Sequence, residues 1–456
     1  MRASLFTREP SKGSRTLPRW YASSKARRLP TRLSLFLLLA VGGSGAIGCA
    51  SPSNNPMEGT GGSGNSAGTT GDAGTTGMAG TTGTAGTTGS GGSSPTTCGP
   101  QTAPGPSGGA NFPFPQHKLS ANCGYPTSCN DADVMTSWNT FKTKMIVNNG
   151  GGLRVQRPEN SNDTVSEGIA YGMLMAVYLV DKTTFDGLWA YAKAHKNGKG
   201  LMNWHIDANG GTVGNGAATD ADEDMAFALM MADKQWGGYA SDASGLVGSI
   251  LASEVTSSNL LLPDDSGNMS SDINPSYFAP AYYKLFATYN ARWTMVADQS
   301  YTMLNRCANA TTGLVADWCT QQGGTSGRSN PPRYYYDAAR TPFRIAQDAC
   351  WNNDSRAVTY LAKVAAFFNG LGPTGIRDGY NLDGTSPGAN AGIMVFEGPV
   401  GVGMMPSKAT YASFLLQNYT RVAVTSKSGT SSAYNYYNGA WGVLTLMMMT
   451  GNMTPF

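Results

Sequence analysis

Ten stretches of helical length recur along the chain after about residue 160, and most are apolar around nearly their whole circumference. Helices of this kind lie inside a packed array, because they leave no face for water. Loops rich in Gly, Asn, Asp and Pro separate them, and strand-type alternation is scarce. Ten to twelve helices in roughly 350 residues fit one closed double ring, an all-α fold in which long loops converge at one end and build a cleft. The stretches are 165–180, 184–195, 222–236, 244–256, 275–290, 292–307, 341–352, 355–370, 409–424 and 437–450.

Residues 1–48 have the features of an export signal. They hold nine Lys or Arg and the single acid Glu9, so the rest of the chain is net −5 although the whole is +3. The apolar stretch 33–41 is too short for a stable membrane anchor. Residues 46–49 (Ala-Ile-Gly-Cys) resemble a lipobox, which would make Cys49 the lipidated first residue of an exported lipoprotein; ordinary cleavage nearby is the alternative. The basic charge therefore indicates export to the cell surface, the outer membrane or the medium, and not a nucleic-acid surface.

Residues 49–105 are expected to be a disordered tether. Ala-Gly-Thr-Thr recurs there every six residues, at 67, 73, 79 and 85, and almost nothing in the segment can be buried. A hexapeptide β-helix would need regular aliphatic residues, which are absent. The chain is thus divided into a signal (1–48), a linker (49–105) and one folded domain (106–456).

The histidine and cysteine content narrows the chemistry of the folded domain. Six cysteines follow Cys49, and an even number in an exported chain permits disulfides. The neighbours Cys123–Cys129 and Cys307–Cys319 are the plausible pairs. With three histidines and no Cys-x-x-Cys, the sequence favours neither a transition-metal site nor a Ser-His-Asp hydrolase.

Four carboxylates fall within the five residues 220–224, immediately before an apolar run. Helix-start acids are favoured by the macrodipole, which explains one or two of them, whereas four in close proximity repel one another. A calcium loop is excluded, because Met225 stands where an EF-hand needs Gly and Met231 where it needs Glu. At least one of these acids is therefore a candidate for chemistry.

Two further acids stand at expected helix starts. Glu167 is followed by small and apolar residues, which would desolvate its carboxyl, raise its pKa and suit a general acid. Asp337 lies three residues before Arg340, which would keep it ionised as a base. The structural alternative is a helix-capping acid for Glu167 and an ion pair at a helix start for Asp337. Aromatic residues near these acids suggest a sugar site, where rings stack on pyranose faces: Trp204, Tyr277, Tyr336 and Tyr434.

Together these motifs resemble glycoside hydrolase family 8, a family of bacterial cellulases, xylanases, lichenases and chitosanases. The match runs from about residue 110 to the C-terminus. It rests on four motifs that follow one another along the chain: Ser166-Glu167-Gly168, Ala218-Thr219-Asp220-Ala221-Asp222 through Trp236, Asn274-Pro275-Ser276-Tyr277 and Tyr336-Asp337-Ala338-Ala339-Arg340. The resemblance implies an (α/α)6 barrel and an inverting mechanism.

The resemblance also implies roles for single residues. Glu167 would be the general acid, Asp337 the general base, and Asp220 the residue that holds the sugar at the cleavage point. Tyr277 would position the attacking water. The substrate-binding set would be completed by Trp204, Tyr336, Arg340 and Tyr434.

An aspartate at 337 points to the cellulase and xylanase branch of the family. The chain is therefore predicted to be an exported endo-β-1,4-glucanase, acting as a monomer without a cofactor on a β-1,4-linked polysaccharide. A xylanase of the same family is the first alternative. A non-catalytic sugar-binding lipoprotein would not need all three acids, and a sugar epimerase normally relies on histidines.

Overall fold

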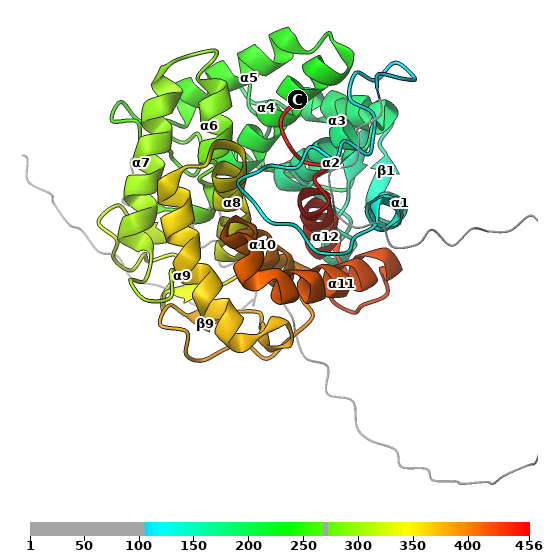
Figure 1. Ribbon diagram of the computed structural model, residues 1–456. Coiled ribbons are helices and arrows are strands. Elements are labelled where there is room, and N and C mark those ends of the chain that lie inside the picture. The colour runs from blue at the N-terminus through cyan, green and yellow to red at the C-terminus, as the bar shows by residue number, and fades with distance from the viewer. Residues whose placement is uncertain (1–104, 268–271) are drawn as a thin grey trace, which may run out of the picture. The chain divides into compact units, whose positions relative to one another are not determined.

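Twelve α-helices form two concentric rings in the computed structural model, which describes residues 105–267 and 272–456 (Figure 1). Even-numbered helices form the inner ring and are almost wholly buried, as their all-round apolar sequences require. The inner helices are α2 (Ser166–Tyr178), α4 (Thr219–Trp236), α6 (Pro280–Phe286), α8 (Thr341–Asn352), α10 (Met394–Met404) and α12 (Tyr436–Met449). The ring closes where α12 packs on α2.

Odd-numbered helices form the outer ring and expose one face to solvent. They are α1 (Asp131–Met145), α3 (Lys182–Ala194), α5 (Ala240–Ser253), α7 (Arg292–Cys307), α9 (Ser355–Leu371) and α11 (Ala412–Ser428). Inner and outer helices alternate along the chain, which is the arrangement of an (α/α)6 barrel. The predicted all-α double ring is confirmed.

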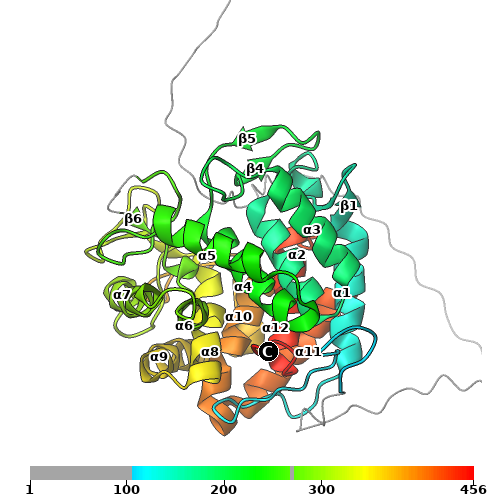
Figure 2. The same ribbon diagram turned by 90° about the horizontal axis from the view of Figure 1, so that it is seen from above.

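Short antiparallel strands extend the loops, and β4, β5 and β6 project at one end of the barrel (Figure 2). Three of them form one sheet, β3 (Thr164–Val165), β4 (His205–Ile206) and β5 (Thr212–Gly214). The others pair two by two: β1 (Ile146–Asn148) with β2 (Leu153–Val155), β6 (Asp272–Ile273) with β7 (Cys319–Thr320), and β8 (Arg333–Tyr334) with β9 (Tyr380–Asn381).

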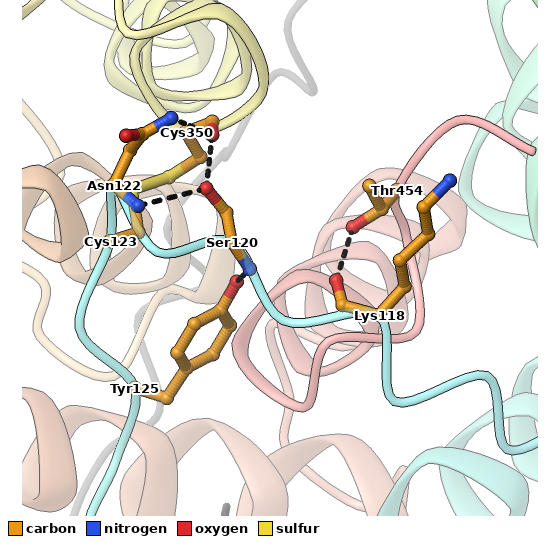
Figure 3. The surroundings of a disulfide bond; sticks show 7 residues. All are labelled: Lys118, Ser120, Asn122, Cys123, Tyr125, Cys350 and Thr454. Carbon is orange, nitrogen blue, oxygen red and sulfur yellow. Dashed lines mark hydrogen bonds between the residues drawn. A yellow bond between two sulfur atoms is a disulfide. The ribbon is translucent and has the colours of Figure 1, made fainter. Parts of the chain in front are cut away.

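The opposite end of the barrel is crossed by residues 110–125. Gln116 donates to the carbonyl of Tyr178 at the end of α2, and Gly124 N–H donates to the carbonyl of Met405 just after α10. Cys123 is disulfide-bonded to Cys350 in the last turn of α8 (Figure 3). This segment therefore ties together the C-terminal ends of several inner helices.

The predicted pair Cys123–Cys129 is wrong, because Cys123 bonds Cys350 across 227 residues of sequence. Proximity in the chain was misleading here, since the crossing segment carries Cys123 to the end of α8. The predicted pair Cys307–Cys319 is confirmed. Cys129 is also disulfide-bonded.

Loss of the long-range disulfide should destabilise the domain more than loss of the short one. Loop entropy attributes about 5 kcal/mol to a bridge spanning 227 residues and about 3 kcal/mol to one spanning 12. Urea unfolding of Cys123→Ser/Cys350→Ser and Cys307→Ser/Cys319→Ser tests this order. Equal losses in the free energy of unfolding would show that residues 110–125 stay in place without the Cys123–Cys350 disulfide.

Two helices were not among the ten stretches of the sequence. The first is α10, whose sequence does not predict a helix because it contains residues that disfavour one: Gly398, Pro399, Gly401 and Gly403. Close packing explains these small residues, since a Cβ on Gly401 would lie 2.1 Å from Asn418 Oδ1. The second is α1, in which polar residues lie between the buried side chains, so that its sequence does not read as an apolar stretch.

The signal, Cys49 and most of the linker lie outside the described residues. Within the described residues, no helix is long and apolar enough to cross a bilayer.

Candidate active site

The inner helices begin at the same end of the barrel, and the candidate acids lie in or just before their first turns. Glu167 is the second residue of α2 and Asp220 the second of α4. Asp337 immediately precedes the 3-10 turn η3 (Ala338–Arg340), which runs into α8. Helix N-termini present partial positive charge and unpaired N–H groups, which favours carboxylates at this end.

Arg340 brings the three acids together. Its Nη1 donates to Glu167 Oε2 at 2.6 Å and to Asp220 Oδ2 at 2.5 Å, and its Nη2 lies 3.1 Å from Asp337 Oδ1. Nη2 also donates to Ser276 Oγ at 2.8 Å. Arg340 is 0% exposed, so it lies beneath the carboxylates as the cation that holds them in one site. Its predicted contact with substrate stays a prediction.

The second carboxyl oxygens of Glu167 and Asp337 accept hydrogen bonds from other elements. Tyr436, the first residue of α12, donates its hydroxyl to Glu167 Oε1 at 2.9 Å. Asn274 donates Nδ2 to Asp337 Oδ2 at 3.0 Å. Asp220 differs, because its Oδ1 is buried without a hydrogen-bond partner among the described residues. That oxygen is available to accept from a bound molecule.

Burial raises the pKa of both Glu167 and Asp337. Desolvation raises the pKa of Glu167 to about 7 against the lowering effect of Arg340, with Asp220 and Asp337 adding to the rise. Desolvation likewise raises the pKa of Asp337 to about 7, against Arg340. Three carboxylates share one guanidinium, so a proton is retained in the group near neutral pH.

A cavity of about 990 Å³ opens on the Glu167 side of the site. Tyr436 lines it together with Tyr336, Tyr434 and Arg157. Arg157 is fixed by two 2.6 Å bonds to Asp163 and lies 5.8 Å from the centre of the Tyr436 ring. The cavity thus combines aromatic and polar groups directly beside the candidate acid, as a sugar site requires.

The other two predicted aromatic residues lie away from this cavity. Tyr277 is in η2 (Pro275–Tyr277), is buried, and its ring lies 5.2 Å below the Arg340 guanidinium. Trp204 precedes β4 and is half-buried. Gly214 packs on its indole so closely that a Cβ would lie 2.3 Å from the ring. Neither Tyr277 nor Trp204 is among the residues that line this cavity.

The other acids of the 220–224 run point to separate partners inside the barrel. Asp224 forms a two-point ion pair with Arg344, with Nη2 to Oδ2 at 2.8 Å. Glu223 accepts from Tyr283 Oη at 2.7 Å, and Asp222 accepts from the backbone N–H of Met202. Only Asp220 among the four reaches Arg340. The run is mainly helix and core structure.

Asp222 lies beside a second buried acid, Glu254 at the end of α5, and this proximity has a consequence for stability. Desolvation and the charge of Asp222 raise the pKa of Glu254 well above its usual range. The folded chain then binds more protons than the unfolded chain, so the free energy of unfolding falls as pH rises above the ordinary pKa of Glu. Glu254→Gln should therefore flatten this decline and raise the melting temperature at pH 8 by about 2–4 °C.

Thermal unfolding from pH 5 to pH 9 checks this prediction, with Asp186→Asn as a control at a partly exposed acid on α3. A parallel decline in wild type and Glu254→Gln would contradict it.

Sequence reasoning missed several groups of the site. Tyr436 was not assigned a role, although it is the first residue of an inner helix, just as Glu167 lies in the first turn of another. Asn274 and Ser276 lie in the quoted Asn-Pro-Ser-Tyr segment, and their contacts with Asp337 and Arg340 depend on the fold.

Comparisons with known proteins agree with this architecture. The family profile described as glycosyl hydrolases family 8 matches residues 112–453. Endoglucanase A of Acetivibrio thermocellus is 41% identical over 351 residues, covering 72% of each chain. Endoglucanase 2 of Ruminiclostridium josui is 36% identical over 75% of this chain and 76% of that protein. A β-1,3-1,4-glucanase from Paenibacillus sp. X4 superposes with a TM-score of 0.69 at 30% identity, covering 75% of this chain and 99% of that one.

Proposed function

Because the chain belongs to glycosyl hydrolase family 8, we propose that it is an endo-β-1,4-glucanase that hydrolyses cellulose or a related β-glucan with inversion at the anomeric carbon. The observation that carries the proposal is the group Glu167, Asp220 and Asp337 on one buried arginine, beside a cavity rich in tyrosine. The endoglucanases among the relatives support the same substrate class.

In the proposed reaction, Glu167 donates its proton to the glycosidic oxygen as the bond to the anomeric carbon breaks. Asp337 takes a proton from a water molecule, whose oxygen forms the new bond from the opposite face of the sugar. Asp220 accepts from a hydroxyl of the sugar at the cleavage point through its unpartnered Oδ1. The proton left on Asp337 returns to solvent, and Glu167 is reprotonated.

The proposed acid and base roles require Glu167 to be protonated and Asp337 to be ionised at the same time. Since both pKa values are raised to about 7, activity should fall below neutrality as Asp337 gains a proton and above it as Glu167 loses one. We expect a narrow bell-shaped profile of kcat/KM centred near pH 7. A plateau extending from pH 4 to pH 6 would contradict it.

Stereochemistry and substrate can be tested together. Proton NMR of cellohexaose hydrolysis should show the α-anomer first, and an initial β product would refute inversion. Reducing-sugar release from carboxymethylcellulose, barley β-glucan, lichenan and xylan separates the substrates. Cleavage of xylan alone would replace the glucanase by the xylanase of the same family, and binding without cleavage of any of them would indicate a sugar-binding lipoprotein.

We further infer that the domain is exported as a monomer and held at the cell surface by a lipid on Cys49. The sequence of residues 46–49 and the Gly/Thr-rich tether support this placement. Incorporation of labelled fatty acid into the wild type and not into Cys49→Ala tests the lipid. Release of both proteins into the medium would favour ordinary signal cleavage.

A further inference from the structure

Asp317 lies next to the candidate base but belongs to a different loop. It precedes β7, and Cys319 in that strand is disulfide-bonded to Cys307 at the end of α7. β7 pairs with β6, which leads directly into Asn274. The segment carrying Asp317 is therefore fixed to α7 of the outer ring and to the loop whose Asn274 donates a hydrogen bond to Asp337.

The Asp317 carboxylate binds the backbone around Asp337. Its Oδ1 accepts from Ala338 N–H at 2.8 Å and from Tyr335 N–H at 3.2 Å. Its own backbone N–H donates to the carbonyl of Arg333 at 3.1 Å. The chain is thus held just before and just after Asp337.

The hydrogen bonds that Asp317 accepts replace the N-cap that the residue before a helical turn usually provides. An Asp at the position before a helical turn commonly caps it by accepting from the first free N–H groups. Asp337 occupies this position before η3 and makes no such cap. Asp317 accepts from Ala338 instead, so the Asp337 carboxyl is free to face Arg340 and Asn274.

Asp317 also acts on Asp337 through charge. Among the carboxylates around Asp337, Asp317 raises its pKa most, ahead of Asp220. Burial raises the pKa of Asp317 itself to about 6, against the backbone N–H groups of Ala338 and Tyr335. Five charged or titratable groups face Asp337, each from a different element: Glu167 of α2, Asp220 of α4, Asp317 of the loop before β7, Arg340 of η3 and Tyr437 of α12.

We propose that Asp317 is a positioning residue for the general base: it caps η3 in place of Asp337 and so leaves the Asp337 carboxyl directed at the reacting water. The proposal rests on the proposed function, since it assigns the base role to Asp337. Asp317 is not required to touch the substrate.

Two substitutions separate the two effects of Asp317. Asp317→Asn keeps an oxygen acceptor and removes the charge, so the acidic limb of the kcat/KM profile should move to lower pH while kcat changes only a few-fold. Asp317→Ala removes the acceptor, so kcat should fall about 10- to 100-fold with KM within about three-fold. Asp181→Ala, which removes the capping carboxylate of α3 elsewhere in the domain, is the control for a general loss of capping.

The assays distinguish the possible failures. A wild type inactive on every β-glucan and xylan refutes the proposed function. An active wild type with unchanged kcat in Asp317→Ala, or with an unmoved acidic limb in Asp317→Asn, overturns the role of Asp317 alone. Titration of carbon-13-labelled aspartate by NMR measures the pKa of Asp337 without turnover, and it should fall in Asp317→Asn whatever the substrate. An unchanged value would also overturn the proposal.

Discussion

Arg340→Met should abolish activity and destabilise the domain at the same time. The guanidinium is fully buried and is the cation shared by Glu167, Asp220 and Asp337. Removing one partner of a buried charge pair costs about 3–5 kcal/mol, because the other charge is left uncompensated. Without Arg340, which lowers the pKa of both Glu167 and Asp337, both carboxyls should hold their protons to higher pH. Asp337 would then be a poor base at neutrality, and kcat at pH 7 should fall about 10²- to 10⁴-fold.

Arg344→Met is a matched control in the first turn of α8, which begins directly after Arg340. Arg344 is equally buried and its ion pair with Asp224 is of the same kind, so a comparable loss of stability is expected. Because its partner is not Glu167 or Asp337, folded Arg344→Met should keep far more activity than Arg340→Met. Arg340→Lys, which keeps the charge but not the two-nitrogen geometry, should be intermediate in both measurements.

Urea unfolding and kcat on soluble β-glucan check these expectations. Wild-type stability in Arg340→Met, or an equal loss of kcat in Arg344→Met, would show that Arg340 is not the organising cation.

Glu167→Gln should remove catalysis while leaving folding and oligosaccharide binding intact. Glutamine keeps the size of the side chain and can still accept a hydrogen bond from Arg340, but it cannot supply the proton. Loss of a general acid lowers kcat by about 10²- to 10⁴-fold. Since a buried carboxyl is replaced by a neutral amide, the melting temperature should be unchanged or higher.

The leaving group distinguishes the acid from the base. With a dinitrophenyl β-cellobioside, whose leaving group needs no proton, Glu167→Gln should recover much of its activity. Asp337→Asn should stay impaired on both substrates, because activation of water is needed in each case. Equal impairment of Glu167→Gln on both substrates would refute its role as the acid, and normal activity on polysaccharide would refute the assignment of the site.

The fold could be predicted because helical periodicity and all-round hydrophobicity are local properties. Stretches such as 165–180 and 437–450 leave no polar face, so a double ring follows from their number. The same reasoning failed for α10, where Gly and Pro oppose helix formation, and the helix exists because close packing against Asn418 and neighbouring helices overrides propensity.

The acids of the site could be named from sequence, because each stands where a polar loop meets an apolar helix. Their relationships could not. Arg340 was read as a local partner of Asp337, three residues away, yet it also bonds Glu167 and Asp220, each more than a hundred residues distant. Similarly, Cys123 bonds Cys350 and not its near neighbour.

The sequence by itself determined the class of fold and the family, and it singled out Glu167, Asp220 and Asp337 as candidates, since these inferences depend on residue type, periodicity and order along the chain. Only the tertiary structure decided where the other three acids of residues 220–224 point, which cation holds Asp220 beside Glu167 and Asp337, and which loop caps the turn after Asp337. These are contacts between inner helices and loops far apart in sequence. They are fixed by the closure of the ring, which brings helix N-termini to one end, buries them away from water and so raises the pKa of Glu167 and of Asp337.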